Sequence, residues 1–230
     1  CPGQIIVFLG SFLSFCNDNI IGENKSFTNM RILIDSRLYG IENAGIGRYI
    51  KNLIRELSKD SQNQYGVILN SKYFNLLNLP PNFEKIKLDI LHYTIKEQIL
   101  LPKTINNFKP DVVHFPHFNV PIFYKGKYIV TVHDLLWHKQ KGFSVTTQPK
   151  FIYLIKYLGY RIVFDSAIKN SSGIVVPSNS VKNDLLKIYT KVENKVKVIY
   201  EGVDEDITQK TVNNKNSVSR GTSYFLYVGS

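Results

Sequence analysis

Short apolar runs alternate along the chain with segments of helical periodicity. Runs rich in β-branched residues predict buried strands at 31–35, 66–69, 85–90, 111–115, 128–132, 173–176 and 196–199. Strands that are apolar almost throughout, and that alternate with helices, indicate a parallel sheet covered on both faces. We therefore expect the α/β fold class, with a Rossmann-like, doubly wound parallel sheet.

Helices are expected in four of the intervening segments. Apolar positions spaced at i, i+3, i+4 and i+7 predict a helix over 46–57. A second helix is expected to begin near Pro102, because proline is accepted at the first helical position, and a third to run over 149–170. A fourth is expected after Ser180 as its N-cap, with Asp184 in the first turn and an apolar face of Val181, Leu185, Ile188 and Tyr189.

The alternation is flanked at both ends by different sequence. The only methionine, Met30, directly precedes the first strand, so residues 1–29 are expected to be a leader outside the functional domain. Their apolar run of about 11 residues is too short to cross a bilayer and lacks the basic segment of a signal peptide. We expect a Rossmann-like domain at 30–211, a polar linker at 212–223, and the start of a truncated C-terminal domain at 224–230.

Charge and cysteine content exclude several classes of protein. Lys and Arg number 29 against 18 Asp and Glu, a formal net charge of +11. The cations are dispersed lysines rather than clustered arginines, so nucleic acid is not an expected partner, whereas phosphorylated substrates or anionic lipid are. The two cysteines, Cys1 and Cys16, leave no thiolate in the rest of the chain for a zinc finger or a disulfide scaffold.

Polar or glycine-rich segments follow five of the predicted strands. Open parallel sheets bind ligands at the carboxyl ends of their strands, so these segments are expected to converge on one site. They are residues 40–48, 114–117, 133–134, 177–180 and 201–204.

The glycine pair of Gly45-Ile46-Gly47-Arg48 opens the predicted helix over 46–57. Bare backbone N–H groups at a positive helix end suit a phosphate, although a plain loop with two glycines has the same pattern. Ile50 stands where a dinucleotide fingerprint has its third glycine, and no carboxylate for a ribose follows the second strand. A nicotinamide-dependent dehydrogenase is therefore not expected.

The histidines allow more than one interpretation. His133 follows a buried strand and stands beside Asp134, which could orient the imidazole or bind a partner of its own. A strand-capping histidine is the structural alternative. His114 and His117 flank a proline without a nearby carboxylate pair, so a metal site is not expected. The acidic triplet at 204–206 is interpreted as a solvated turn, and no Gly-x-Ser-x-Gly elbow of a hydrolase occurs in the sequence.

The segment 151–168 is apolar on nearly every side but carries Lys156 and Arg161. These charges argue against a membrane span and for a helix buried between layers or domains. Docking on a membrane surface is the alternative.

Six segments, taken in order, resemble the N-terminal half of family 4 glycosyltransferases. They are MRILID at 30–35, GIGRYIKNL at 45–53, PDVVHFPH at 110–117, VTVHDL at 130–135, VVPSNS at 175–180 and VKVIYEGVD at 196–204. The resemblance implies the glycosyltransferase-B fold, in which two Rossmann-like domains face each other across a cleft. The N-terminal domain mainly shapes the acceptor site and the C-terminal domain binds most of the sugar nucleotide.

The resemblance also implies roles for individual residues. His133 would be the catalytic position, hydrogen bonding and orienting groups at the reaction centre beside the transferred sugar. Substrate-binding positions would be Gly45, Ile46, Gly47 and Arg48 near the donor diphosphate, Asp134, Ser178 on the cleft floor, and His114, His117 and Asn119 on the acceptor side. Tyr200-Glu201 departs from the Pro-Asn of many members, and the basic pair and Glu-x7-Glu motif of the family would fall beyond Ser230.

The expected function is retaining transfer of mannose or a similar hexose from a nucleotide sugar to a glycan or lipid-linked acceptor, without metal or cofactor. The expected location is cytoplasmic with peripheral contact at the inner membrane face, and the acceptor-side half is expected to be inactive alone. The alternative is a noncatalytic Rossmann-like binding module or a sugar-nucleotide-processing domain. An epimerase would need a Tyr-x-x-x-Lys pair, whereas Tyr153 is followed by Tyr157 and Tyr157 by Arg161.

Overall fold

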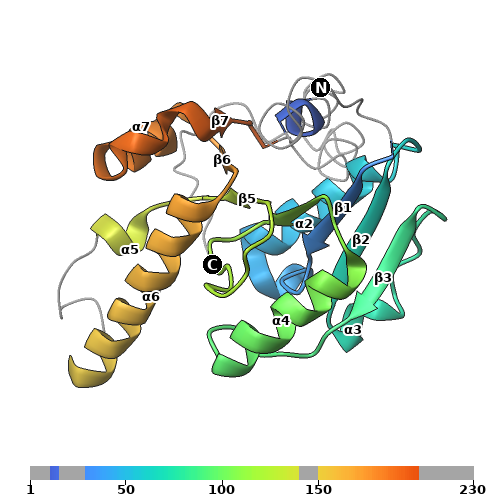
Figure 1. The fold of residues 1–230 in the computed structure, drawn as a ribbon, viewed down its shortest axis with the longest axis horizontal. Helices are drawn as coiled ribbons and strands as arrows, with labels where there is room; N and C mark the ends of the chain where they lie inside the picture. Colours follow the sequence, from blue (N-terminus) through green and yellow to red (C-terminus); the bar gives the residue numbers. More distant parts are fainter. Residues whose placement is uncertain (1–10, 16–28, 140–149, 202–230) are drawn as a thin grey trace, which may run out of the picture.

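The computed structural model describes residues 11–15, 29–139 and 150–201 (Figure 1). The strands are β1 (Arg31–Asp35), β2 (Gln64–Leu69), β3 (Phe83–Lys87), β4 (Val112–Phe115), β5 (Tyr128–Thr131), β6 (Gly173–Val176) and β7 (Val196–Val198). The helices are η1 (Ile41–Asn43), α2 (Ala44–Leu57), α3 (Ser71–Phe74), α4 (Ile95–Phe108), α5 (Leu136–Lys139), α6 (Lys150–Asn170), α7 (Asn179–Ile188) and η3 (Thr190–Lys195). The expected linker at 212–223, the strand at 224–230 and the acidic triplet at 204–206 lie outside the described residues.

The strands form one parallel sheet in the order β3-β2-β1-β4-β5-β6-β7. The chain builds outward from β1 to one edge and then returns beside β1 to build toward the other. This order confirms the expected Rossmann-like α/β class. It also places the topological switch point, where such sheets bind ligands, between β1 and β4.

Alternate strand residues enter two separate cores, one on each face of the sheet. In β5, Tyr128 and Val130 pack with α4 and α6, whereas Ile129 packs with α2. The same alternation recurs in β1, where Leu33 faces the first core and its two neighbours face the second. The sheet is thus covered on both faces, as the apolar strands predicted.

A short helical segment at 11–15 also contributes to the α2 core. Phe12 and Phe15 are buried, and the Phe12 ring lies 4.8 Å from the ring of His114. A Cβ on Gly173 would lie 2.7 Å from the Phe15 ring, so glycine makes room for this packing. The placement of residues 1–29 outside the functional domain stays a prediction.

Two helix starts differ from expectation. α4 begins at Ile95, where the Thr94 hydroxyl accepts a hydrogen bond from Glu97 N at 3.2 Å, and Pro102 therefore lies inside the helix rather than at its start. α7 is capped by Ser178, which accepts from Val181 N, so Ser180 is the second helical residue. Both predictions were wrong because a capping side chain upstream began the helix earlier.

Candidate functional site

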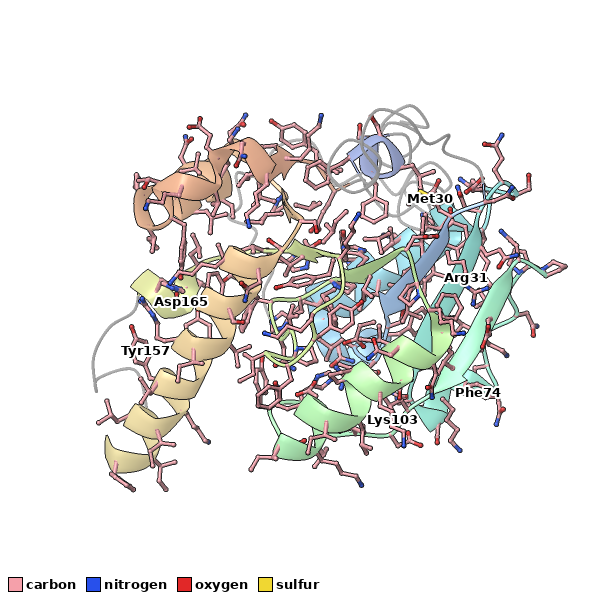
Figure 2. All side chains as sticks on the ribbon, in the orientation of Figure 1. Met30, Arg31, Phe74, Lys103, Tyr157 and Asp165 are labelled. Atoms are coloured by element: carbon pink, nitrogen blue, oxygen red, sulfur yellow. The ribbon has the colours of Figure 1, made fainter. Side chains whose placement is uncertain are left out.

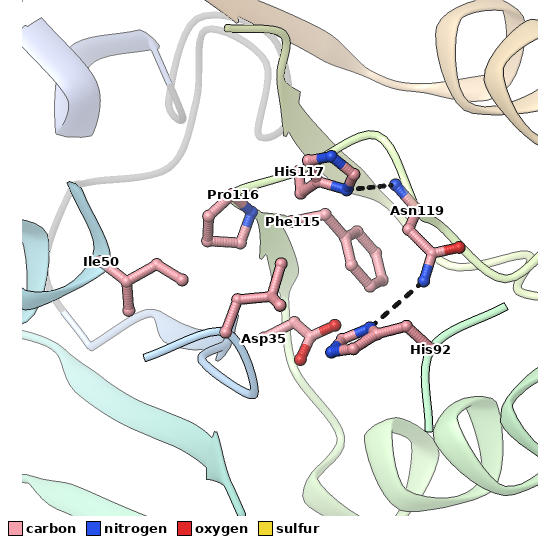
Figure 3. A pocket seen from close by; sticks show the side chains of 8 residues that line it. Asp35, Ile50, His92, Phe115, Pro116, His117 and Asn119 are labelled. Atoms are coloured by element: carbon pink, nitrogen blue, oxygen red, sulfur yellow. Dashed lines mark hydrogen bonds between the residues drawn. The ribbon is translucent and has the colours of Figure 1, made fainter. Parts of the chain in front are cut away.

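A small pocket that is open to solvent lies at the carboxyl ends of β1 and β4 (Figure 3). It therefore occupies the switch point of the sheet. The lining residues are Asp35, Leu38, Ile50, His92, Phe115, Pro116, His117 and Asn119. Figure 3 shows Pro116 and His117 above Asp35 and His92, with Asn119 between His117 and His92.

A buried ion cluster of Asp35, Arg37 and Glu97 lies next to the pocket. Arg37 donates from Nε and Nη2 to the two carboxylate oxygens of Asp35 at 2.8 and 2.7 Å. Nη2 also donates to Glu97 Oε1 at 2.7 Å, which joins the end of β1 to the first turn of α4. The three side chains are almost completely buried, so the cluster fixes the position of Asp35 in the pocket wall.

The cluster favours the charged forms of Arg37 and Glu97. Burial alone would lower the pKa of Arg37, but the charges of Asp35 and Glu97 outweigh it and raise that pKa. Burial opposes ionisation of Glu97, yet the hydrogen bond from His92 and the charge of Arg37 lower the pKa of Glu97 to about 2. Two carboxylates against one guanidinium leave this part of the wall negative at neutral pH.

Asn119 connects this cluster to the pocket. Its Nδ2 donates to Glu97 Oε1 at 2.9 Å and lies 3.4 Å from His92 Nδ1, while its backbone N–H faces His117 Nδ1 at 3.4 Å. Among the described residues, the buried Oδ1 of Asn119 has no hydrogen-bond partner. Arg37 Nη1 and the Ser36 hydroxyl are buried and unpaired in the same sense. Such atoms are costly to bury unpaired, and of these three residues Asn119 lines the pocket, so its Oδ1 can accept a hydrogen bond from a polar ligand.

His133 stands at the carboxyl end of β5, next to this wall. Its Nε2 lies 2.9 Å from the carbonyl oxygen of Pro116, and its Nδ1 lies 3.0 Å from Glu201 Oε1. The ring also meets Tyr49 of α2 edge-on, with 5.0 Å between ring centroids. A carbonyl and a carboxylate only accept hydrogen bonds, so both contacts are satisfied together when both ring nitrogens carry protons.

His114 lies beneath the site rather than in it. Its ring is completely buried, and Nε2 hydrogen bonds with the hydroxyl of Thr131 at 2.9 Å, which in turn lies 3.2 Å from the Tyr49 hydroxyl. Burial, together with the nearby His133, lowers the pKa of His114 to about 3, so the ring is neutral. The expected contact between His114 and the substrate stays a prediction. In the structure, His114 is connected to His133 indirectly, through Thr131 and Tyr49.

Of the three histidines predicted for the site, His117 lines the pocket directly. Burial, with the charges of His133 and His92, lowers its pKa to about 4. A neutral ring can accept or donate one hydrogen bond, which suits recognition of hydroxyl groups better than of anions.

The remaining predicted residues lie at helix starts. Gly45 and Arg48 are exposed in the first turn of α2, Ile46 is half-buried, and Gly47 is buried. A Cβ on Gly47 would overlap the carbonyl oxygen of Gly40, whereas one on Gly45 would meet no atom within 4 Å. The two glycines therefore differ, because Gly47 is required by packing while Gly45 leaves backbone open at the helix end.

Asp134 and Ser178 both bind backbone. Asp134 Oδ1 accepts from Leu136 N at 3.0 Å at the start of α5, so this carboxylate has a partner of its own and does not orient His133. Ser178 Oγ accepts from Val181 N at the start of α7. Their expected substrate contacts stay predictions.

The sequence interpretation missed four residues: Asp35, Arg37, His92 and Glu97. Glu201 lies in the segment 201–204, which was expected at the site, and Asp35 is the last residue of β1, so the same strand-end rule contained a signal for it. Glu97 could have been found through the Thr-x-x-Glu capping pattern at the start of α4. His92 and Arg37 offer no local pattern, because their partners are distant in sequence.

Across the described segments, no group of three or more His, Cys, Asp or Glu side chains is arranged to hold a metal ion. None of the helices in those segments is both long and apolar enough to cross a membrane.

Comparison with known proteins identifies the family. No curated protein matches the chain at a significant level. Among solved structures, the oxidoreductase ylbE from Lactococcus lactis aligns with 82% of this chain and 99% of its own, at 9% identity and a TM-score of 0.38, a likeness too low to support an argument. The model of Glycosyltransferase Family 4 matches residues 43–207, which include His117, His133 and Glu201. The chain therefore belongs to glycosyltransferase family 4, as the order of its motifs predicted.

Proposed function

We propose that this chain forms the acceptor side of a retaining, metal-independent glycosyltransferase. The enzyme transfers mannose or a similar hexose from a nucleotide sugar to a hydroxyl group of a glycan or lipid-linked acceptor. The observation that carries the proposal is the position of His133, which contacts Pro116 and Glu201 beside a pocket that contains the unpaired Oδ1 of Asn119.

The acceptor binds at the pocket between β1 and β4. Asn119 Oδ1 and the Asp35 carboxylate accept hydrogen bonds from its hydroxyl groups, and neutral His117 binds a further hydroxyl. Hydroxyl recognition of this kind fits a sugar, since the wall holds negative charge that repels phosphate. The pocket thus orients the acceptor hydroxyl near His133.

His133 acts where the sugar leaves its diphosphate. The Pro116 carbonyl fixes the ring through Nε2, and the second N–H points to Glu201, which is 43% exposed. An incoming oxygen of the donor replaces Glu201 and receives this hydrogen bond. A protonated imidazole then stabilises the negative charge that develops on the departing diphosphate. The exposed first turn of α2, with Gly45 and Arg48, approaches the same diphosphate.

The proposal is tested by substituting His133 and Glu201 in the enzyme that contains this domain. His133→Ala is expected to lower kcat about 100- to 1000-fold, because a charge-stabilising donor is lost. Glu201→Gln, which keeps a hydrogen-bond acceptor, is expected to cost about tenfold or less. Glu193→Gln, an exposed glutamate of η3, serves as the matched control with unchanged turnover.

Folding of each variant is checked by circular dichroism and thermal unfolding. The anomeric configuration of the product, followed by NMR, and turnover in excess EDTA test retention and metal independence. Near-wild-type kcat of a folded His133→Ala enzyme would remove His133 from the reaction. An inverted product or a loss of turnover in EDTA would reject the corresponding part of the proposal.

A further inference from the structure

Helix α6 carries two apolar stripes on opposite sides. One stripe, made of Tyr160, Phe164, Ala167 and Ile168, is buried against the sheet and α4. The other is made of Phe151, Ile155, Leu158 and Ile162, which recur at i, i+4, i+7 and i+11 and therefore share one helix face. At 100° per residue this second face lies roughly opposite the first. We call these four residues the outer stripe.

The outer stripe is exposed over its whole length. Its side chains are between 52% and 72% exposed, and Leu154 beside it is 57% exposed. In Figure 2, Tyr157 lies in the part of α6 that projects from the body of the molecule, and Asp165 lies nearer to the sheet. A row of large apolar side chains on a projecting helix is the kind of surface that marks an interaction site.

Charge distinguishes between the kinds of partner. Residues 150–164 contain Lys150, Lys156 and Arg161 but no Asp or Glu, and the first carboxylate of α6 is Asp165. Arg161 and Lys156 lie on either side of the outer stripe, about 90° and 130° from its centre. A second copy of this chain would bring the same cations against these, and the like charges would repel. An anionic surface instead complements them, in a chain whose formal charge is +11.

We propose that the outer stripe docks α6 on the surface of a bilayer that contains anionic lipids. The helix lies in the interface, where Phe151, Ile155, Leu158 and Ile162 enter the acyl boundary and the flanking cations reach back to the headgroups. The stripe is about 16 Å long, which fits a helix lying flat. Its length and its position on one helix face distinguish this mode from a membrane span, which no described helix supports.

Docking also orients the candidate site. Helices that follow parallel strands begin at the carboxyl edge of the sheet, so the start of α6 lies on the same edge as the pocket. A lipid-linked acceptor at the bilayer surface would then be presented to that edge. This consequence rests on the proposed function, whereas docking itself does not.

Vesicle co-sedimentation tests the proposal with the full chain. Vesicles of phosphatidylcholine with about one third phosphatidylglycerol are expected to bind the protein, and pure phosphatidylcholine to bind it about tenfold less. Ile155→Glu/Leu158→Glu is expected to lower the partition coefficient about tenfold or more, because two inserting side chains become charged. Leu76→Glu, at a leucine that is 67% exposed far from α6, is the matched control and should bind like the wild type.

A second pair of variants tests the attraction between the cations of α6 and the anionic headgroups. Lys156→Gln/Arg161→Gln is expected to weaken binding to the anionic vesicles about tenfold. Lys51→Gln/Lys87→Gln removes the same charge from α2 and the edge strand β3, and should weaken it far less. Added salt should weaken wild-type binding.

Three results would overturn the proposal. They are equal binding to both kinds of vesicle, binding that survives the stripe substitution, and a dimer in light scattering that the stripe substitution abolishes. Thermal unfolding of each variant excludes misfolding as the cause of a loss. Transfer to a water-soluble acceptor should persist in the stripe variant, which separates docking from the proposed transferase function.

Discussion

At the residue scale, Glu97 shows how folding and the candidate site share one side chain. Its Oε2 accepts from Tyr93 N at 2.7 Å and helps to close the start of α4. Its Oε1 accepts from Arg37 and Asn119 and so holds the pocket wall. A change at Glu97 therefore affects stability before it affects any ligand.

The first prediction concerns stability in acid. Since the pKa of Glu97 is about 2 in the folded protein, below its ordinary value of 4.5, only the unfolded chain takes up its proton between these values. Its contribution is complete above about pH 4.5 and is lost as the pH falls toward 2. His117 and His114, with pKa values lowered to about 4 and 3, add a loss that begins below about pH 6.5.

Urea unfolding between about pH 3 and 8 measures these contributions. Glu97→Gln is expected to lose about 2 kcal/mol at pH 7 and to flatten the dependence below pH 4.5. The exposed Glu84 of β3 provides the control, since Glu84→Gln should keep the wild-type profile. If Glu97→Gln kept the wild-type dependence of unfolding free energy on pH, the ion cluster would not be a source of stability.

At the scale of elements, the start of α2 depends on a close contact between two glycines. Gly40 has a φ of 125°, a conformation that favours glycine, and its carbonyl oxygen lies where a Cβ of Gly47 would be. Gly45, two residues earlier in the same helix, faces open space. Within one helical turn, Gly47 is therefore required by packing, whereas Gly45 is not.

Thermal and urea unfolding test this difference. Gly47→Ala is expected to destabilise the chain by about 3 kcal/mol, because the added methyl group must displace the backbone at Gly40. Gly45→Ala should instead leave stability unchanged or raise it by up to about 1 kcal/mol, since alanine is the better helix former. Equal effects of the two substitutions would contradict the contact.

The elements also show what could be predicted from the sequence. The central strands could be predicted from their apolar runs, because a strand that is buried on both faces contains few polar residues. Pro102 does not predict the start of α4, because the side chain of Thr94 caps the helix and the helix begins at Ile95. The pocket could not be assembled, because Arg37 and Glu97 lie 60 residues apart and His133 and Glu201 lie 68 apart, and neither pair leaves a local pattern.

At the scale of the whole molecule, the α2 face of the sheet is completed by residues distant from it in sequence. Phe12 lies against His114 of β4, and Phe15 lies against Gly173 of β6. Both aromatic side chains belong to the same core as Ile50 and Leu53 of α2. Residues 11–15 therefore contribute to the packing of this sheet.

Phe12→Ala is accordingly expected to lower the free energy of unfolding by about 3 kcal/mol, as for other buried aromatic side chains. The matched control is Phe123→Ala, the same substitution at a ring that is 64% exposed, which should change stability by less than about 1 kcal/mol. Calorimetry or urea unfolding of the 230-residue chain measures both. A neutral Phe12→Ala would mean that the segment does not pack on the sheet in solution.

The residues of the pocket region differ in how much they contribute to folding. Arg37 and Glu97 are buried and ion-paired, and His92 hydrogen bonds with Glu97, whereas Leu38 is partly exposed and lies outside this cluster. Substitution of Leu38 can therefore alter which ligand fits without a large loss of stability, while substitutions in the cluster are constrained. Descendants of this sequence can diverge in specificity at Leu38 and still retain the same architecture.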